Sequence, residues 1–569
     1  MNTSYQFVKY NRNTGSDYFL KMNQFQPIIC IDFEDSISDP INPKNNLKLK
    51  IKARNNFTEI VTENADRLNQ ITWGFRVNSP DSEDFKLDFE LLNKLNGCLN
   101  IQAIIIPKVE SVKHIKTVEK IFDGKIRYKE IIPLIESKAG INNLENIIGT
   151  CFKNILKVGF GHCDYNQDQN IFPFFHQNSR EYWKWVERIV EIINKTKIIF
   201  MNSAYLELQN DSGFIQNLHQ LNKLTGGNFG QFTLSKRQTS IYNIFNKVQN
   251  SGSLKFKHRL DFNYSDSYAE TLVKQFEENK SELGFVVENG SGILISPQEY
   301  ISAKNKLKGN RKAKINIVYI GGCFPVQNGI LFEDLFHYKL RNKIDFTNKF
   351  KMNLKIIRYE NLIQCVEDVK SIDTLDKIDF IVFHIRPEPF LRKVKVLFRF
   401  RNKNGEIISH FNIPFNRKEI SDHYNLEYSP SQIKSNSFLP ESRMHKFMYD
   451  LNIIIGLLIG NATFSLKKYN KTILEIVKIA EKRKIKIILL GSPFRESSYT
   501  EKYAMNKFTK YFEKTYLEAY ADYVSGFDAE IVRNNSKYFH KNGLATESYH
   551  DWVSIQIHKK ITSIINEEL

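Results

Sequence analysis

Short apolar runs that end in charged or amide residues alternate with longer amphipathic stretches through the first 250 of 569 residues. This alternation predicts parallel strands joined by crossover helices. Because most of the runs are apolar throughout, we expect each strand to be buried on both faces, as in a closed barrel whose active site lies at the carboxyl ends of its strands. The runs span residues 27–35, 71–78, 100–110, 130–137, 155–164 and 197–204.

A second series of apolar runs begins after the basic stretch KNKLKGNRKAK (304–314). It opens with INIVYIGGCF, a buried strand that leads into a Gly-rich turn, and continues at residues 353–360, 377–390, 453–461 and 485–494. We therefore predict an α/β protein with an N-terminal extension (1–24), a (β/α)8 barrel of the TIM type (25–310) and a three-layer α/β domain (311–569).

Composition excludes several classes of protein. The six cysteines form no C-x-x-C pair, so neither a disulfide framework nor a zinc knuckle is indicated, and a reducing cytoplasm is expected. The longest apolar stretch, residues 452–460, is too short to span a membrane. The net charge of +18 raises the question of nucleic acid, but the basic runs lie far apart and share no recognisable motif. Neither nucleic acid nor a membrane is expected as a partner.

Polar side chains that could serve chemistry end five of the first strands. In a barrel these groups would meet at one end. Taken singly, each is more simply explained as an ion pair or a helix cap, and the spacing alone names no reaction. The residues are Asp32, Glu34, Asp35, Arg76, Asn78, Lys108, Glu110, Glu136 and Asp164.

Two of these carboxylates follow consecutive strands. Glu136 and Asp164 would present hard oxygen ligands to a shared cavity, and one or two carboxylates are how proteins commonly hold Mg2+ beside a substrate. Arg76 would offer a planar fork to a substrate carboxylate.

Several motifs occur in the order found in a known family. IDFEDSI, KARNNF, FRVNSP, IIIPKVES, PLIESKAGI and FGHCD resemble successive elements of the HpcH/HpaI aldolase and citrate lyase beta-subunit family. VVENGSGILISPQEYISAKNKL is similar to its closing segment, so the resemblance covers about residues 25–308. In one element, where the family has His and Pro, this chain has Ser235 and Lys236, although Gln238 remains.

The resemblance implies a Mg2+-dependent TIM barrel that makes or breaks a carbon–carbon bond of a 2-oxo acid, with an acyl-CoA thioester or an aldehyde as the second substrate. It implies that Glu136 and Asp164 are the metal ligands. Arg76, Asn78 and Lys108 are the expected substrate-binding residues. Asp32, Glu34 and Asp35 would hold metal-bound waters or neighbouring side chains, and Asp32, Asp35 and Arg76 are assigned to the catalytic group. It also implies a homo-oligomer.

The second half resembles SGNH (GDSL-like) hydrolases at lower specificity. IVYIGGCFPVQNG would place Cys323 where such enzymes have the nucleophilic Ser, and LLIGNATF would supply Asn461 to an oxyanion hole. Near the C-terminus two registers compete for the acid and base. One offers Glu547 and His550, and the other places Asn542 and Ala545 at those positions.

The two registers lead to different functions for the second domain. With His550 as the base, it would transfer or hydrolyse an acyl group, and the fusion would suit polysaccharide tailoring. In the other register it is an inactive module that binds a sugar or a protein.

Overall fold

The computed structural model describes the protein in two compact units, which comprise most of residues 1–308 and most of residues 309–569. The residues described are 4–8, 15–149, 154–246, 255–258, 266–279, 284–288, 292–308, 313–322, 324–327, 330–346, 350–358, 362–371, 378–386, 424–427, 451, 454–455, 462–493, 499–517, 520, 522–526, 528–540 and 545–568. The strand predicted at 453–461 lies largely outside them.

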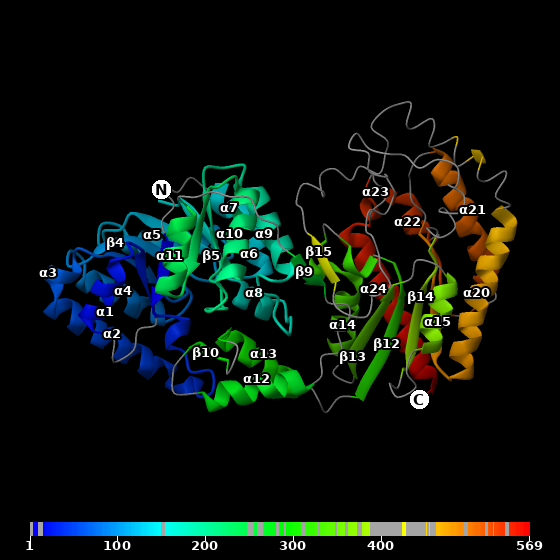
Figure 1. The fold of residues 1–569 in the computed structure, drawn as a ribbon, viewed down its shortest axis with the longest axis horizontal. Helices are drawn as coiled ribbons and strands as arrows, with labels where there is room; N and C mark the ends of the chain where they lie inside the picture. Colours follow the sequence, from blue (N-terminus) through cyan, green and yellow to red (C-terminus); the bar gives the residue numbers. More distant parts are fainter. Residues whose placement is uncertain are drawn as a thin grey trace. The chain divides into compact units, whose positions relative to one another are not determined.

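The first unit contains a closed barrel of eight parallel strands in sequential order, which confirms the predicted barrel (Figure 1). Aliphatic and aromatic residues of the strands fill its interior, among them Ile28, Ile105, Ile132 and Phe232. The strands are β1 (Ser4–Val8), β2 (Ile28–Asp32), β3 (Thr72–Arg76), β4 (Asn100–Ile106), β5 (Glu130–Ile135), β6 (Lys157–Phe160), β7 (Ile199–Asn202) and β8 (Phe229–Thr233).

The first strand corrects the predicted domain map. Residues 1–24 were expected to form an extension outside the barrel, but β1 pairs with β2 on one side and with β8 on the other. Without it the sheet would have two open edges, with unpaired backbone groups. The run SYQFV is short and flanked by polar residues, so local pattern alone does not identify it as a strand.

Helices surround the strands of the first unit. They are α1 (Ser16–Asn23), α2 (Asn46–Glu63), α3 (Ala65–Leu68), α4 (Asp84–Lys94), α5 (Val112–Phe122), α6 (Lys138–Asn142), α7 (Leu144–Gly149), α8 (His162–Asp168), α9 (Arg180–Ile193), α10 (Asp211–Thr225), α11 (Lys236–Phe245), α12 (Asp266–Glu278) and α13 (Pro297–Lys308). Three shorter strands follow the barrel, β9 (Lys255–His258), β10 (Val286–Val287) and β11 (Leu294–Ile295).

The element in which the chain departs from the family pattern begins a helix. Ser235 is the N-cap of α11, and its hydroxyl accepts a hydrogen bond from the backbone N–H of Gln238. The side-chain oxygen of Gln238 accepts in turn from the N–H of Leu234. This reciprocal arrangement resembles a capping box, so the local sequence here is accounted for by the helix start.

The second unit is built on a five-stranded parallel sheet in the order β13-β12-β14-β16-β17 (Figure 1). The first strand in sequence lies inside the sheet, and the strand order reverses there, as in doubly wound folds. The strands are β12 (Ala313–Gly321), β13 (Phe350–Arg358), β14 (Phe380–His384), β16 (Lys486–Leu490) and β17 (Tyr523–Val524), and β15 (Tyr424–Glu427) lies outside this sheet.

Helices cover both faces of this sheet, which gives the expected three layers. One core lies between the sheet and α14 (Phe336–Phe346) and α24 (Glu547–Glu568). The other lies between the sheet and α15 (Leu362–Ser371), α20 (Ala462–Lys482) and α21 (Tyr499–Tyr516). Two short helices, α22 (Ala529–Arg533) and α23 (Asn535–Tyr538), precede α24. The SGNH-like character of the unit stays a prediction.

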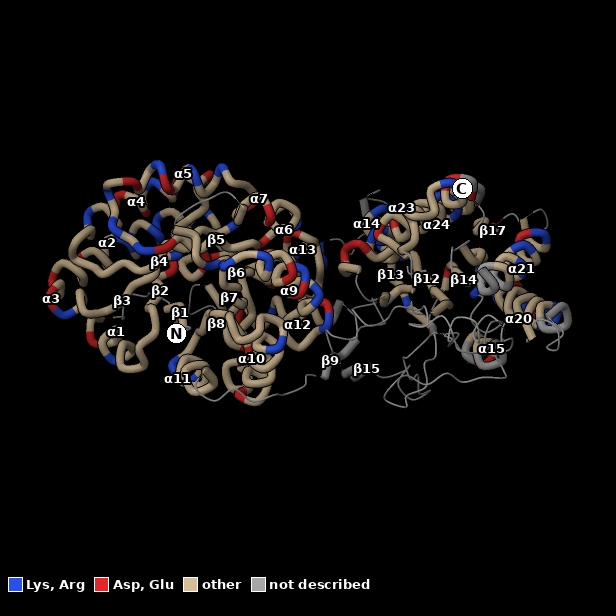
Figure 2. The backbone as a smooth tube through the Cα atoms, turned by 90° about the horizontal axis from the view of Figure 1, so that it is seen from above, with Lys and Arg blue, Asp and Glu red and all other residues tan. Residues whose placement is uncertain are grey.

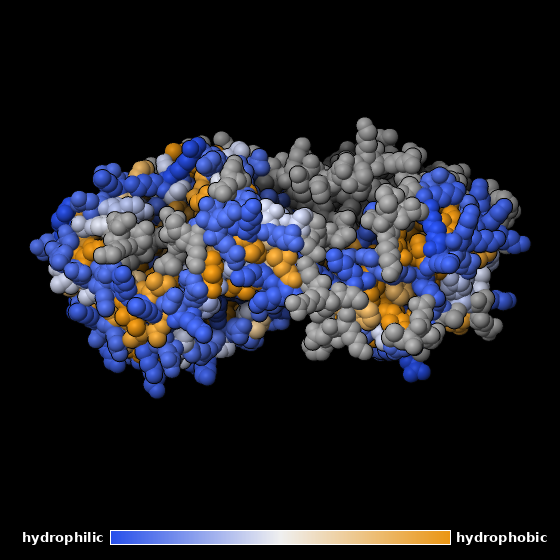
Figure 3. Space-filling model, turned by 90° about the horizontal axis from the view of Figure 1, so that it is seen from below, coloured by the Kyte–Doolittle hydropathy of each residue, from blue (hydrophilic) through white to orange (hydrophobic). Residues whose placement is uncertain are grey.

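The surface carries mixed charge. Lys and Arg alternate with Asp and Glu along the helices of the first unit (Figure 2). On the face shown in Figure 3, hydrophobic patches are separated by hydrophilic residues. Among the helices in the described ranges, none combines the length and the apolar character needed to cross a bilayer.

Candidate active site at the rim of the barrel

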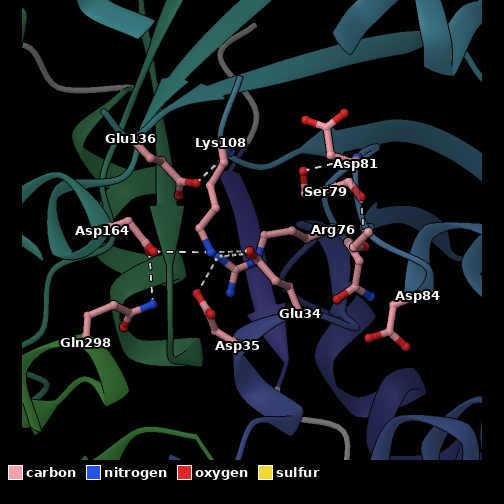
Figure 4. A network of polar contacts seen from close by, with 12 residues as sticks. Glu34, Asp35, Arg76, Ser79, Asp81, Asp84, Lys108, Glu136, Asp164 and Gln298 are labelled. Carbon is pink, nitrogen blue, oxygen red and sulfur yellow. Dashed lines mark hydrogen bonds and ion pairs between the residues drawn. The ribbon is translucent and has the colours of Figure 1, made fainter. Parts of the chain in front are cut away.

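The carboxyl ends of β2 to β6 lie at one end of the barrel, which we call the rim. Seven charged side chains predicted from the sequence form a connected group there, and Figure 4 labels all of them except Asp32. They are Asp32, Glu34 and Asp35 after or at the end of β2, Arg76 at the end of β3, Lys108 after β4, Glu136 after β5, and Asp164 in α8 after β6. The barrel thus brings together residues that are more than 100 positions apart.

Arg76 pairs with all three carboxylates that follow β2. Its Nε and Nη2 donate to the two oxygens of Asp32, at 2.8 and 2.5 Å. Its Nη1 lies 3.2 Å from Glu34 Oε2 and 3.2 Å from Asp35 Oδ2. Two nitrogens of the guanidinium that was predicted to bind a substrate carboxylate are therefore bonded to Asp32. The third, Nη1, contacts Glu34 and Asp35.

Asp32 is buried, ionised and held in place by several hydrogen bonds. It is 3% exposed, and besides Arg76 its oxygens accept hydrogen bonds from the backbone N–H groups of Glu34 and Ser36, both at 3.0 Å. Burial opposes its ionisation, but the charge and hydrogen bonds of Arg76 prevail and hold the pKa of Asp32 below its ordinary value. Asp32 thus fixes the orientation of the guanidinium.

Lys108 connects three of the carboxylates. Its backbone N–H donates to Glu136 Oε2 at 2.8 Å, while its Nζ donates to Glu34 Oε1 at 2.8 Å and lies 3.4 Å from Asp164 Oδ1. Its φ of 53° is in the left-handed region, which a lysine seldom adopts. Burial disfavours its charge, but Glu34 and Asp164 outweigh burial and raise the pKa of Lys108.

Glu136 depends on a glycine at the end of the next strand. A Cβ at Gly161 would lie 2.1 Å from Glu136 Oε1, so a larger residue there would displace this carboxylate. Asp164 follows three residues later in α8, and its Oδ2 accepts a hydrogen bond from Gln298 Nε2 at 3.0 Å. The two predicted metal ligands thus end neighbouring strands, with Lys108 in contact with both.

Negative charge is in excess at the rim, where five carboxylates face Arg76 and Lys108. Burial and repulsion by Asp35 raise the pKa of Glu34 to about 7 and that of Asp164 to about 6. Burial and repulsion by Asp164 raise the pKa of Glu136 well above its ordinary value. Hard oxygen donors with uncompensated charge are the donor set that Mg2+ prefers, so the residues present fit this ion.

The side chains do not yet form a coordination shell. Within the described ranges, no group of three or more His, Cys, Asp or Glu residues is placed so that it could hold a metal ion. In this arrangement the ammonium of Lys108 contacts Glu34 and Asp164, where a cation would be expected. The assignment of Glu136 and Asp164 as metal ligands therefore stays a prediction.

Asn78, predicted to bind substrate, is held by the barrel wall. Its Nδ2 donates to Phe33 O and to Asp88 Oδ2, and its Oδ1 accepts from Lys50 Nζ. Asp88 is fully buried and also pairs with Arg54, at 2.7 Å. The network fixes the ends of β2 and β3 in place. Sequence reasoning missed Asp88 because a carboxylate inside a helix gives no local signal.

Gln298 is a second residue that sequence reasoning missed. It lies in α13 and reaches Asp164 across 134 positions of sequence, and it is 4% exposed (Figure 4). The run SPQEY identifies a helix start, because Ser296 accepts from the N–H of Glu299. Nothing local shows that the helix packs against the rim.

In the second unit, Cys323, Asn461 and Asn542 lie outside the described residues. Ala545 forms a bridge with Phe539, and Glu547 is the first residue of α24. His550 is fully buried and stacks on Phe324 with ring centroids 4.1 Å apart. Its Nδ1 accepts a hydrogen bond from the N–H of Phe336 at 3.1 Å.

This hydrogen bond fixes the tautomer of His550. A neutral imidazole that accepts at Nδ1 carries its proton on Nε2. The base of a hydrolase triad needs the opposite arrangement, with Nδ1–H donated to the acid and Nε2 free to accept the proton of the nucleophile. In this arrangement Nδ1 of His550 accepts a hydrogen bond from the backbone and does not donate to an acid.

Comparison with known proteins locates the resemblance in the first unit. Residues 25–227 match the model of the HpcH/HpaI aldolase/citrate lyase family, which confirms the resemblance inferred from the motifs. No curated protein matches the chain.

Solved structures similar to the chain have low sequence identity. They include RipC from Yersinia pestis (18% identity, 43% of this chain and 95% of that chain, TM-score 0.33). A citrate lyase beta subunit from M. tuberculosis, complexed with oxaloacetate and magnesium, is 14% identical (43% and 98%, TM-score 0.34). A malate synthase from Haloferax volcanii, in a pyruvate/acetyl-CoA ternary complex, is 13% identical (54% and 90%, TM-score 0.42).

Proposed function

We propose that the first unit is a Mg2+-dependent carbon–carbon lyase or aldolase that acts on a 2-oxo acid. The match of residues 25–227 to the aldolase/citrate lyase family supports the reaction class. The observation that carries the proposal is the excess of buried carboxylate at the rim, where Glu34, Glu136 and Asp164 all have raised pKa values. Such a cluster is costly unless a cation offsets it.

Glu136 and Asp164 would hold the metal. When bound, Mg2+ stabilises the negative charge that develops on the keto oxygen as the carbon–carbon bond forms or breaks. Gly161 provides the space that the Glu136 carboxylate needs beside the end of β6.

The protein side chains would bind the 2-oxo acid and transfer the proton that the reaction adds or removes. Arg76 would offer Nη1 to the substrate carboxylate in place of its contacts with Glu34 and Asp35. Asp32 holds the other edge of the guanidinium and keeps its plane fixed. Glu34, with a pKa of about 7, can take up or release a proton at Oε2 near neutral pH, as general acid–base catalysis requires. Lys108 supplies a second cation for an anionic substrate.

The second substrate is an acyl-CoA thioester or an aldehyde. The family resemblance favours the thioester, whereas the departure at Ser235 and Lys236 alters an element of the family pattern. With a thioester, its α-carbon would lose a proton and add to the keto carbon of the 2-oxo acid, giving a hydroxy acid thioester. With an aldehyde, C3 of the 2-oxo acid would lose a proton and add to the aldehyde carbon, giving a 4-hydroxy-2-oxo acid.

The test is to incubate the full chain with Mg2+ and a panel of 2-oxo acids, each alone, with acetyl-CoA or propionyl-CoA, and with a panel of aldehydes, and to identify products by mass. We expect a new hydroxy acid, or its thioester, only in the presence of Mg2+. Glu136→Gln is the inactive variant, and Glu145→Gln, an exposed carboxylate on α7 paired with Lys195, is its control. Absence of any Mg2+-dependent product with every pair would overturn the proposal.

For the second unit, the geometry of His550 favours the inactive alternative. We propose a sugar- or protein-binding module instead of an acyltransferase or esterase, because the hydrogen bond from Phe336 leaves Nε2 of His550 protonated. The full chain and His550→Ala are to be compared with a thiol- or serine-directed acyl probe and with a chromogenic acetyl ester. We expect no labelling or hydrolysis that depends on His550. Activity lost in His550→Ala would restore the catalytic alternative.

A further inference from the structure

Lys108 occupies an unusual position at the rim. Its ammonium is within 3.4 Å of Asp164 and donates to Glu34, while its backbone N–H donates to Glu136. One residue thus contacts carboxylates that follow three different strands. Among the described residues of β4 and the turn that follows it, no other residue contacts carboxylates from three strand ends.

The geometry of Lys108 is suited to movement. Its side chain is 46% exposed, whereas the carboxylates of Glu34 and Asp164 that it contacts are only 8% and 11% exposed. Part of the side chain therefore borders solvent, so the ammonium can leave the carboxylates without repacking the barrel core. Figure 4 shows the side chain reaching from its strand end toward Glu34 and Asp164.

The charge balance gives this position a role. The ammonium contacts Asp164, which is a proposed metal ligand, and Glu34, which would lie beside the metal ion. Two cations on the same oxygens repel each other, and this repulsion in a partly buried site is several times that in water. A bound metal ion would therefore favour withdrawal of the ammonium.

We infer that Lys108 is an internal counterion that holds the rim carboxylates in the metal-free protein and is displaced into the mouth of the barrel by Mg2+. This inference rests on the proposed function and adds a mode of regulation to the same site. The displaced ammonium would face an incoming anionic substrate, so metal binding would prepare the substrate site.

The first test is the affinity for Mg2+ alone, measured by calorimetry at pH 8 on the full chain. Removing the competing ammonium in Lys108→Met should tighten Mg2+ binding at least about tenfold. Lys108→Arg, which keeps a cation at this position, should remain within about threefold of the unaltered protein. Lys113→Met, on the exposed face of α5, removes a charge outside the cluster and should change the affinity less than about twofold.

A second measurement needs no variant and so does not depend on how Lys108→Met folds. Reductive methylation of the unaltered protein, followed by peptide mass analysis, reports how accessible each lysine ammonium is. We expect Mg2+ to raise the methylation rate of Lys108 about threefold or more, while that of Lys113 stays constant.

The outcomes separate the two proposals. Mg2+ binding that is unchanged or weaker in a folded Lys108→Met, or an unchanged methylation rate of Lys108 in protein that binds Mg2+, overturns the counterion role and leaves the proposed function intact. No heat of Mg2+ binding in either the unaltered protein or Lys108→Met overturns both.

Discussion

The two units of this protein use parallel strands in the same way but differ in how the polar residues at the strand ends are satisfied. At the rim of the barrel, five carboxylates meet two cations, and the pKa values of three of the carboxylates are raised. In the second unit, His384 at the end of β14 is buried and bonded to Tyr319, and His550, which lies in α24, is buried and accepts a hydrogen bond from a backbone N–H.

The difference shows that polar residues at strand ends do not by themselves make an active site. A polar group that finds its partner within the fold contributes to stability. A cluster of like charges without enough partners is destabilising, and a ligand of opposite charge can offset that cost. By this criterion we propose that the barrel is the enzyme and that His550 in the second unit has a structural role.

The largest expected effect is on the metal ligands of the barrel. Glu136→Gln or Asp164→Asn should lower Mg2+-dependent turnover at least about 100-fold, because each removes a charged ligand. Steady-state assay of the product identified by mass checks this, with Glu145→Gln as the control. Either variant with full activity would refute its assignment as a ligand.

The buried ion pair should dominate stability at the same rim. Arg76→Met leaves Asp32 without its cation, so the free energy of unfolding should fall by about 3–5 kcal/mol. Urea-induced unfolding followed by tryptophan fluorescence measures this effect.

Arg67→Met is the matched control for Arg76→Met, because Arg67 pairs with Asp17 at the surface. It should cost less than about 1 kcal/mol. Equal losses in the two variants would contradict the importance given to burial.

In the second unit, His550→Phe removes the acceptor at Nδ1. The ring can still stack on Phe324, but the N–H of Phe336 loses its acceptor, which should cost about 1–3 kcal/mol. Hydrogen exchange of the segment that contains Phe336 should quicken, while Mg2+-dependent turnover stays unchanged. Loss of a second, acyl-transferring activity would show that His550 is catalytic.

A smaller effect is expected from pH. Because the folded-state pKa of Glu34 is about 7, against an ordinary 4.5, the metal-free folded protein binds more protons than the unfolded chain between these values. Its stability should therefore fall as pH rises through this window. Mg2+ needs the ionised carboxylates, so its affinity should weaken by about tenfold per pH unit as pH falls below about 6, where Asp164 is protonated.

Thermal unfolding between pH 5 and pH 8 tests the predicted fall in stability with rising pH, and calorimetry over the same range tests the predicted loss of Mg2+ affinity with falling pH. Mg2+ affinity that stays constant across this range would contradict the raised pKa values. Glu34→Gln should reduce the pH dependence of metal-free stability.

Much of the barrel and its rim could be predicted because the signals are local. The six strands β2 to β7 fall within mostly apolar runs, and Asp32, Arg76, Glu136 and Asp164 stand at or just beyond the ends of such runs. Parallel strands bring these ends together whatever the details of packing. The residues alone could therefore place the charges on one rim.

Features that depend on distant partners could not be predicted. Strand β1 is identified only by its pairing with β2 and β8, and Gln298 only by the packing of α13 against the rim. The position of the Lys108 ammonium depends on the left-handed backbone of that residue. Glycine and asparagine favour this conformation, but a lysine gives no such indication in the sequence. In the second unit, the role of His550 depends on a backbone N–H that lies 214 residues away.

The central claim is that the rim of the barrel binds one divalent cation through Glu136 and Asp164. Titration of the full chain with Mg2+ at pH 8, followed by calorimetry, tests it most directly. The account predicts one Mg2+ per chain in the unaltered protein and no detectable binding in Glu136→Gln or Asp164→Asn. Binding of equal stoichiometry and affinity in these variants, or its absence from the unaltered protein and Lys108→Met alike, would contradict it.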